Sequence, residues 1–201
     1  MKQYLSLCAL IAVATVFLHA PAWATVTDEV KLTVDKVVAI VSDPALKKPQ
    51  NEEHRRAELK KAISRIFDYG EMAKRSLGVH WKKRNAAEQK EFVNLFATLL
   101  ENSYAGKIES YENERIVYGK ETIEGDYAEV KSKIVTAKRD EYTIDYRLLK
   151  EGSRWMVYDV VIEGVSLVSN YRSQFNKIIL NQGYGALVKK LKAKSEEISS
   201  L

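Results

Sequence analysis

A serine stands where an apolar, alternating segment gives way to a helical pattern, in the motif Gly164-Val165-Ser166-Leu167-Val168. Hydrolases place a nucleophile at such a junction, but this motif lacks the second glycine of the nucleophile elbow. A serine nucleophile also needs a base and an orienting acid, and neither His54 nor His80 lies in a companion motif. We therefore expect Ser166 to cap the following helix.

Two carboxylates, Asp159 and Glu163, lie four residues apart on one face of a predicted strand. At the usual rise along a strand they are about 13 Å apart, which is too far for joint work on one bond. We expect at least one of them to pair with an arginine or a tyrosine. No catalytic centre emerges from these residues, and we predict that the protein is not an enzyme.

Metal and cofactor sites are not indicated either. The single cysteine, Cys8, lies in the N-terminal apolar run, and only His54 and His80 remain beyond residue 24. Cysteine and histidine metal sites need more ligands than this, so we predict no metal and no cofactor. The formal charge of +5 comes without a basic-aromatic motif, so we also predict no nucleic-acid partner.

The first 24 residues are typical of a cleaved secretory signal. Lys2 precedes an uncharged apolar run from Leu5 to Leu18, which is too short for the roughly 20 residues of a membrane-spanning helix. The small residues Ala22 and Ala24 predict cleavage after Ala24. Residues 25–201 then form a single domain with 31 basic and 27 acidic side chains and no cysteine. Its core must be stable without disulfides.

Apolar residues recurring at spacings of three and four predict helices in the first half of the chain. The ranges are 27–42, 51–67, 72–77 and 86–111. Asn51 is the expected N-cap of the second helix, and Gly78 the left-handed C-terminal residue of the third. The fourth helix has an apolar stripe too wide for one neighbouring helix, so it faces a broad surface.

Alternating residues then predict antiparallel strands, with a weaker first strand at 115–120 followed by strands at 128–134, 142–148 and 155–163. The last strand has two apolar faces, with Met156, Tyr158, Val160 and Ile162 on one side and Trp155, Val157 and Val161 on the other. Two helices follow Gly164. This order predicts an α+β fold in which helices pack on one face of a curved antiparallel sheet of about four strands, with an internal apolar cavity between the layers.

Two basic clusters stand out: Lys82-Lys83-Arg84, between the predicted third and fourth helices, and Lys189 to Lys194, on the predicted last helix. The default interpretation is a solvated helix face. The alternatives are docking on anionic lipid headgroups or on an acidic protein surface.

The stretch from Trp155 to Phe175, WMVYDVVIEGVSLVSNYRSQF, resembles the MlaC, or toluene-tolerance, family of periplasmic phospholipid-binding proteins. The segment Phe67-Asp68-Tyr69-Gly70-Glu71-Met72-Ala73, the pair Leu77-Gly78 and the helix from Gln89 to Tyr111 are similar to the same family. The resemblance therefore covers nearly all of residues 25–201.

This resemblance implies a soluble periplasmic shuttle that carries a phospholipid and maintains the lipid asymmetry of the outer membrane. The implied partners are an outer-membrane lipoprotein complex and an inner-membrane ABC transport complex with a lipid-binding subunit, together with transient membrane contact. Acyl chains are expected inside the protein, with the headgroup exposed. No motif identifies the headgroup or the acyl length.

The predicted cavity wall takes the apolar residues of the wide helical stripe, the strands and the helix after Gly164. These residues are Leu95, Phe96, Leu99, Tyr104, Val130, Ile134, Ile144, Tyr146, Val157, Val161, Tyr171 and Phe175, and Arg172 is the predicted headgroup contact. One alternative is an exported small hydrolase or isomerase that acts on an apolar substrate in the same cavity. Another is a noncatalytic adaptor with a filled core that binds proteins through its basic faces.

Overall fold

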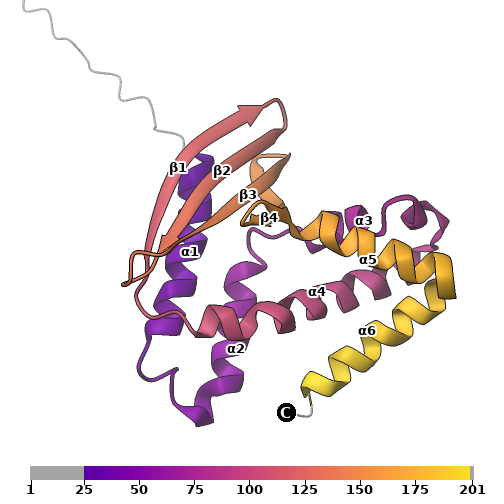
Figure 1. Cartoon of the computed structure of the whole chain (residues 1–201), viewed down its shortest axis with the longest axis horizontal. Coiled ribbons are helices and arrows are strands. Elements are labelled where there is room, and N and C mark those ends of the chain that lie inside the picture. Colours follow the sequence, from indigo (N-terminus) through magenta and orange to yellow (C-terminus); the bar gives the residue numbers. More distant parts are fainter. Residues whose placement is uncertain (1–24, 200–201) are drawn as a thin grey trace, which may run out of the picture.

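The computed structural model describes the backbone of residues 25–199 and the side chains of residues 25–195. The predicted signal and its cleavage after Ala24 lie outside the described residues. Helices come first, a meander of strands follows, and two helices close the fold (Figure 1). This is the predicted α+β class. Across the described part of the chain, no helix has the length and apolar character needed to cross a membrane.

The N-terminal helices follow the apolar periodicity, and their bounds are α1 Val26–Ser42, η1 Pro49–Asn51, α2 Glu52–Ile63, α3 Tyr69–Leu77, η2 Gly78–Lys83 and α4 Ala86–Glu109. Gly78 has the positive φ that was expected at the end of α3. Asn51 precedes α2, but its side chain donates to the carbonyl of Ala45 and does not cap the helix. The expected cap at Asn51 is therefore wrong, because its side chain is directed to this loop carbonyl and not to the first turn of α2.

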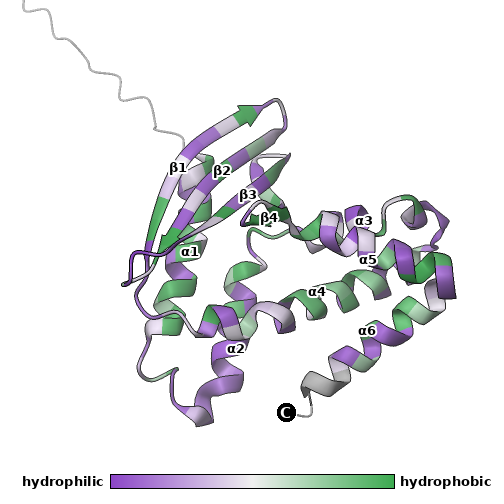
Figure 2. Ribbon diagram, in the orientation of Figure 1, coloured by the Kyte–Doolittle hydropathy of each residue, from purple (hydrophilic) through white to green (hydrophobic). Residues whose placement is uncertain are grey.

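The strands form one open antiparallel sheet in chain order, with bounds β1 Arg115–Glu124, β2 Tyr127–Val135, β3 Glu141–Glu151, β4 Arg154–Ile162 and β5 Val165–Ser166. The fifth strand is only two residues long. Hydrophilic and hydrophobic residues alternate along the long strands (Figure 2). On β2 the predicted inward residues Ala128, Val130 and Ser132 are buried, which confirms the alternation.

The faces of β4 differ from the prediction because a bulge interrupts its pairing with β3. Leu148 lies opposite Val157 and Tyr146 opposite Val160, so Tyr158 is an extra residue on β4. The extra residue reverses which side chains point inward. Trp155, Val157, Val160 and Ile162 consequently share the inner face, and the predicted division of this strand is wrong.

Helices pack against the sheet at two places, one along β1 and β2 and the other beside β4 (Figure 1). Helix α1 crosses the sheet and is held at its start by Glu121 of β1, whose carboxylate accepts from the amide of Thr27 at 2.7 Å and from its hydroxyl at 2.6 Å. Helices α5 Leu167–Gln182 and α6 Tyr184–Ser199 pack with α3 and α4 beside β4. The linker between α2 and α3 bonds to Val157 through Ile66 and Asp68.

Candidate functional site

The buried apolar residues form three separate clusters. The helix cluster consists of Met72, Ala73, Leu77, Phe92, Phe96, Leu99, Leu100, Val168, Phe175, Leu187 and Leu191. The sheet cluster consists of Val26, Val30, Ile66, Ala128, Val130, Leu148, Val157, Val160 and Leu167, and the α1–α2 cluster of Ile40, Val41, Leu59 and Ala62. The helix cluster and the sheet cluster share partly buried neighbours, so accessible surface remains where they approach each other.

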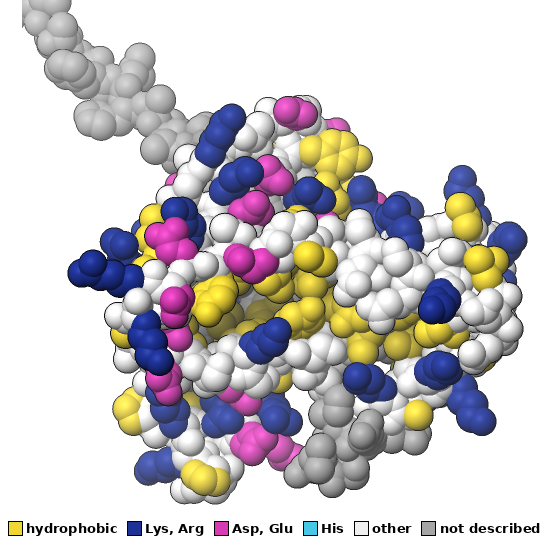
Figure 3. Space-filling view, viewed as in Figure 1, with side chains coloured by type: hydrophobic (Ala, Val, Ile, Leu, Met, Phe, Trp, Pro, Cys, Tyr) yellow, Lys and Arg dark blue, Asp and Glu magenta, His cyan; other side chains and the backbone are white. Residues whose placement is uncertain are grey.

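A hollow opens between the sheet and α4 in the space-filling view, and hydrophobic side chains form its floor (Figure 3). We call it the central hollow. Tyr104 of α4 and Phe67 are half-buried and pack against both the helix cluster and the sheet cluster. These two residues therefore mark the boundary at which the two clusters approach each other without merging.

Tyr146 of β3 packs against the sheet cluster. Its side chain is only half-buried, and its hydroxyl has no hydrogen-bond partner among the described residues. Desolvation nevertheless raises its pKa to about 12.

Two further tyrosines share this desolvated environment. Burial raises the pKa of Tyr104, and the nearby Tyr171 adds to the effect. Burial also raises the pKa of Tyr118 well above its ordinary value, with smaller contributions from Tyr146 and Asp35, and the Tyr118 hydroxyl is buried without a partner. Burial thus desolvates the hydroxyl groups of tyrosines on both α4 and β1.

Alkaline titration tests the burial of the Tyr146 hydroxyl. Because its pKa is near 12 in the folded protein and near 10 when unfolded, ionisation is harder in the folded state. The free energy of unfolding is therefore unaffected below pH 10 and falls as the pH rises from 10 towards 12. We expect Tyr146→Phe to make this fall shallower, as measured by denaturant unfolding across the pH range. An unchanged slope would mean that Tyr146 is solvated.

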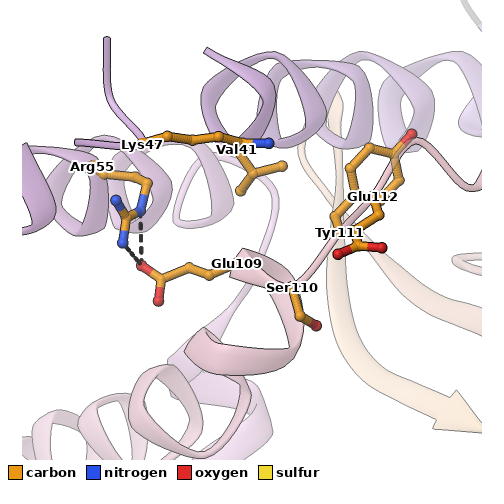
Figure 4. A pocket seen from close by; sticks show the side chains of 7 residues that line it. All are labelled: Val41, Lys47, Arg55, Glu109, Ser110, Tyr111 and Glu112. Atoms are coloured by element: carbon orange, nitrogen blue, oxygen red, sulfur yellow. Dashed lines mark hydrogen bonds and ion pairs between the residues drawn. The ribbon is translucent and has the colours of Figure 1, made fainter. Parts of the chain in front are cut away.

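A different pocket, of about 280 Å³, lies where the ends of α1 and α4 meet α2 (Figure 4). It is lined mainly by charged and polar side chains, and Arg55 binds Glu109 across it through Nε and Nη2, both at 3.0 Å. Arg55 also donates to the carbonyl of Leu46 at 2.8 Å. This lining gives no apolar shelter, so the pocket does not suit an acyl chain.

Ten of the twelve predicted cavity residues lie in the helix or sheet cluster or pack against one of them. Phe96, Leu99 and Phe175 are buried in the helix cluster, and Leu95, Tyr104 and Tyr171 pack against it. Val130 and Val157 are buried in the sheet cluster, with Ile144 and Tyr146 packed against it. Their contact with lipid stays a prediction.

Two of the predicted residues lie elsewhere. Val161 pairs with Asp145, so it points to the opposite face of the sheet from Tyr146 and Val160. Ile134 is half-buried opposite Ile116 and belongs to none of the three clusters.

Ser166 caps α5 as expected. Its Oγ accepts from the amide of Ser169 at 3.0 Å and donates to Asp159 Oδ2 at 2.6 Å. Asp159 is 3% exposed, pairs with Arg147 at 3.4 Å and accepts from the amide of Val168. The expected pairing of this carboxylate with an arginine is confirmed. His80, which was considered above as a base for Ser166, forms its hydrogen bond with Asn176, with 2.8 Å between Nε2 and Oδ1.

Removing the Ser166 hydroxyl should therefore affect stability. We expect Ser166→Ala to lower the free energy of unfolding by about 1–2 kcal/mol, because α5 loses its cap and a buried carboxylate loses a donor. Denaturant unfolding measures the loss. Ser173→Ala is the matched control, since the Ser173 hydroxyl only donates to a carbonyl within the exposed face of α5. Equal stability of the two variants would contradict the capping role.

Comparison with known proteins decides the family. A family model described as MlaC protein matches residues 31–193. The chain belongs to the MlaC family. A curated relative, the intermembrane phospholipid transport system binding protein MlaC of Haemophilus influenzae, is 26% identical over 126 residues. The match spans 60% of this chain and 59% of that protein.

A solved structure from the same family extends the likeness to nearly the whole fold. The phospholipid-binding protein of Ralstonia solanacearum, solved in complex with a phospholipid, superposes with a TM-score of 0.76 at 27% identity. The superposition covers 85% of this chain and 96% of that one. The fold of this MlaC-family chain is thus one that accommodates a phospholipid in a relative.

Arg172, the predicted headgroup contact in this MlaC-family chain, lies on α5 against the end of α3. Its Nε donates to the carbonyl of Arg75 at 2.7 Å, and its methylenes lie over Gly78. A headgroup role for Arg172 stays a prediction. In the described residues, no group of three or more His, Cys, Asp or Glu side chains is placed to hold a metal ion.

Some residues that pack against the sheet cluster were not among the predicted cavity residues. Ile162 and Tyr118 pack against the sheet cluster, as does Val34 of α1. The bulge at Tyr158 turns Ile162 to the inner face of the sheet, and no sequence signal predicts that bulge. Tyr118 and Val34 do lie on apolar stripes of their elements, which is the one signal that was available.

Proposed function

We propose that this chain is a periplasmic carrier that binds one phospholipid, with the acyl chains in the central hollow and the headgroup at its opening. The observation that supports this most directly is the hollow itself, which has an apolar floor between two clusters that do not merge. The phospholipid-bound relative of the same fold supports the same class of ligand.

The energetics of lipid transfer require such a hollow. Two acyl chains with about 30 methylenes, at about 0.8 kcal/mol each, are held in a bilayer by roughly 24 kcal/mol. A carrier must offer nearly equal apolar shelter, which an exposed groove does not. We propose that the wall includes Tyr104, Tyr146, Ile144 and Ile162, which are half-buried and pack against the sheet cluster.

The proposed carrier is exported, is cleaved after Ala24 and acts as a single lipid-binding domain over residues 25–201. It exchanges phospholipid between an outer-membrane lipoprotein complex and an inner-membrane ABC transport complex with a lipid-binding subunit. This exchange maintains the lipid asymmetry of the outer membrane and involves transient membrane contact. The name of the Haemophilus influenzae relative, which describes intermembrane phospholipid transport, supports this role.

Native mass spectrometry of the purified protein, combined with extraction and analysis of bound lipid, tests the proposal. We expect one phospholipid per chain. A protein that is free of lipid after expression, and that takes up none from phospholipid vesicles, would contradict the proposal and favour a protein-binding adaptor. Turnover of an added ester substrate would instead favour the hydrolase interpretation.

A further inference from the structure

One end of the molecule is rich in Lys and Arg, and the glutamates that border it pair with only some of them. Residues 72–87 contain five Lys and Arg, residues 164–195 contain six, and neither range contains Asp or Glu. The rest of the chain from residue 25 onwards has 20 basic and 27 acidic side chains. In Figure 3, Lys and Arg accordingly dominate the end formed by η2, α5 and the start of α6, while Asp and Glu gather elsewhere on this face.

Several of these cations have no counterion. Lys82, Lys83 and Lys177 are exposed, and none of them makes an ion pair or hydrogen bond with another described residue. The neighbouring Arg84 differs, because it pairs with Glu88 at 3.2 Å. The charge of these three lysines is therefore not compensated by a neighbouring carboxylate.

Two large aliphatic side chains protrude beside these lysines. Val79 of η2 is 76% exposed and Leu180 of α5 is 71% exposed. The hydrogen bond between His80 and Asn176 joins the two elements, and Leu180 lies one turn beyond Asn176 on the same stripe of α5. We call this surface the basic tip and define it as Val79, Lys82, Lys83, Lys177 and Leu180.

We propose that the basic tip docks on the surface of an anionic phospholipid bilayer. Each lysine near such a surface raises partitioning by roughly five-fold, and exposed aliphatic side chains enter the boundary between headgroups and acyl chains. A deformable lipid surface accepts single protruding side chains anywhere, whereas a protein partner needs a matching pocket for each. The charge and the shape of the tip together favour the bilayer.

This docking surface deepens the membrane contact proposed above, but it is separate from the cargo site. In Figure 3 the central hollow opens on a different part of the face from the end that carries the tip. The tip therefore tethers the protein to the membrane and is not the entrance for lipid. Docking is measurable whether or not the hollow holds a phospholipid.

Co-sedimentation with phosphatidylcholine vesicles, with and without phosphatidylglycerol, tests the proposal. We expect binding only when phosphatidylglycerol is present, and loss of binding at about 1 M salt, where the Debye length falls to about 3 Å. The double variant Lys82→Glu/Lys83→Glu should bind at least about 25-fold more weakly. Leu180→Gln should weaken binding without changing its dependence on salt.

The double variant Lys47→Glu/Lys48→Glu is the matched control. It changes two adjacent, exposed lysines by the same charge, in the loop between α1 and α2 and away from the tip. We expect it to bind vesicles nearly as well as the unchanged protein, and both double variants to keep their bound phospholipid. Equal weakening by the two double variants would reduce the effect to net charge and overturn the proposal. Absence of vesicle binding by the unchanged protein at low salt would also overturn it and leave an acidic protein as the partner of this surface, while co-purifying phospholipid would still support the carrier function.

Discussion

Replacing Tyr104 by glutamate is expected to lower phospholipid affinity by at least about 30-fold, because placing a carboxylate against acyl chains costs roughly 2 kcal/mol or more. Tyr104 is half-buried, packs against both the helix cluster and the sheet cluster, and belongs to the proposed cavity wall. Water reaches the carboxylate when the hollow is empty. The free energy of unfolding of the lipid-free protein should therefore fall by less than about 2 kcal/mol. Transfer of a labelled phospholipid from vesicles measures the affinity.

Tyr127→Glu is the control for this substitution. Tyr127 is 48% exposed on the outer face of the sheet, where its ring meets Tyr158 edge-on and Arg75 lies near both rings. The same chemical change at this position should leave phospholipid binding unchanged, and Tyr104→Phe should also bind normally. If Tyr104→Glu unfolded the protein, or bound lipid as well as Tyr127→Glu does, Tyr104 would not border the lipid site.

Replacing Phe96 by alanine is expected to have the larger effect on stability. Its side chain is 0% exposed and meets three aromatic rings, with 6.0 Å between centroids to Phe92, 5.4 Å to Tyr171 and 5.9 Å to Phe175. Removing a buried phenylalanine leaves a cavity and costs about 3–5 kcal/mol. Denaturant unfolding of the lipid-free protein should show this loss, while the folded fraction should bind phospholipid with nearly unchanged affinity.

Asn94→Ala, at an exposed position on the same helix, is the control and should change stability by less than about 0.5 kcal/mol. The opposite pattern for Phe96→Ala, a small stability loss with a collapse of lipid binding, would place Phe96 in the cavity wall and not in the helix cluster. The two substitutions on α4 thus distinguish its packed section from its lipid-facing section.

The helices and strands follow from the sequence because their signals are local. The apolar spacing of α4, the alternation along β2 and the glycine after α3 each depend on neighbouring residues, and each matches the structure. The cap at Ser166 is equally local, since a serine before a helix has an amide three residues away to bind.

Tertiary packing decided the faces of β4. A single extra residue opposite β3 moves Val160 and Ile162 to the inner face and leaves Val161 on the outer face. Both faces of this strand are apolar, so the sequence pattern does not indicate which set of alternating side chains points to the inner face. The position of Asn51 was decided in the same way, by a loop carbonyl that only the folded chain brings near.

The sequence by itself determined which side chains avoid water, and with them the α+β order of elements and the family likeness. It did not determine what covers those side chains, because burial in a core and burial against a ligand produce the same apolar stripe. Only the tertiary structure separates Phe96, which other rings enclose, from Tyr104 and Tyr146, which stay half-buried and which we propose as part of the cavity wall. The physical reason is that a hollow depends on how far apart two packed clusters stand, and the hydropathy of one element carries no information about that distance.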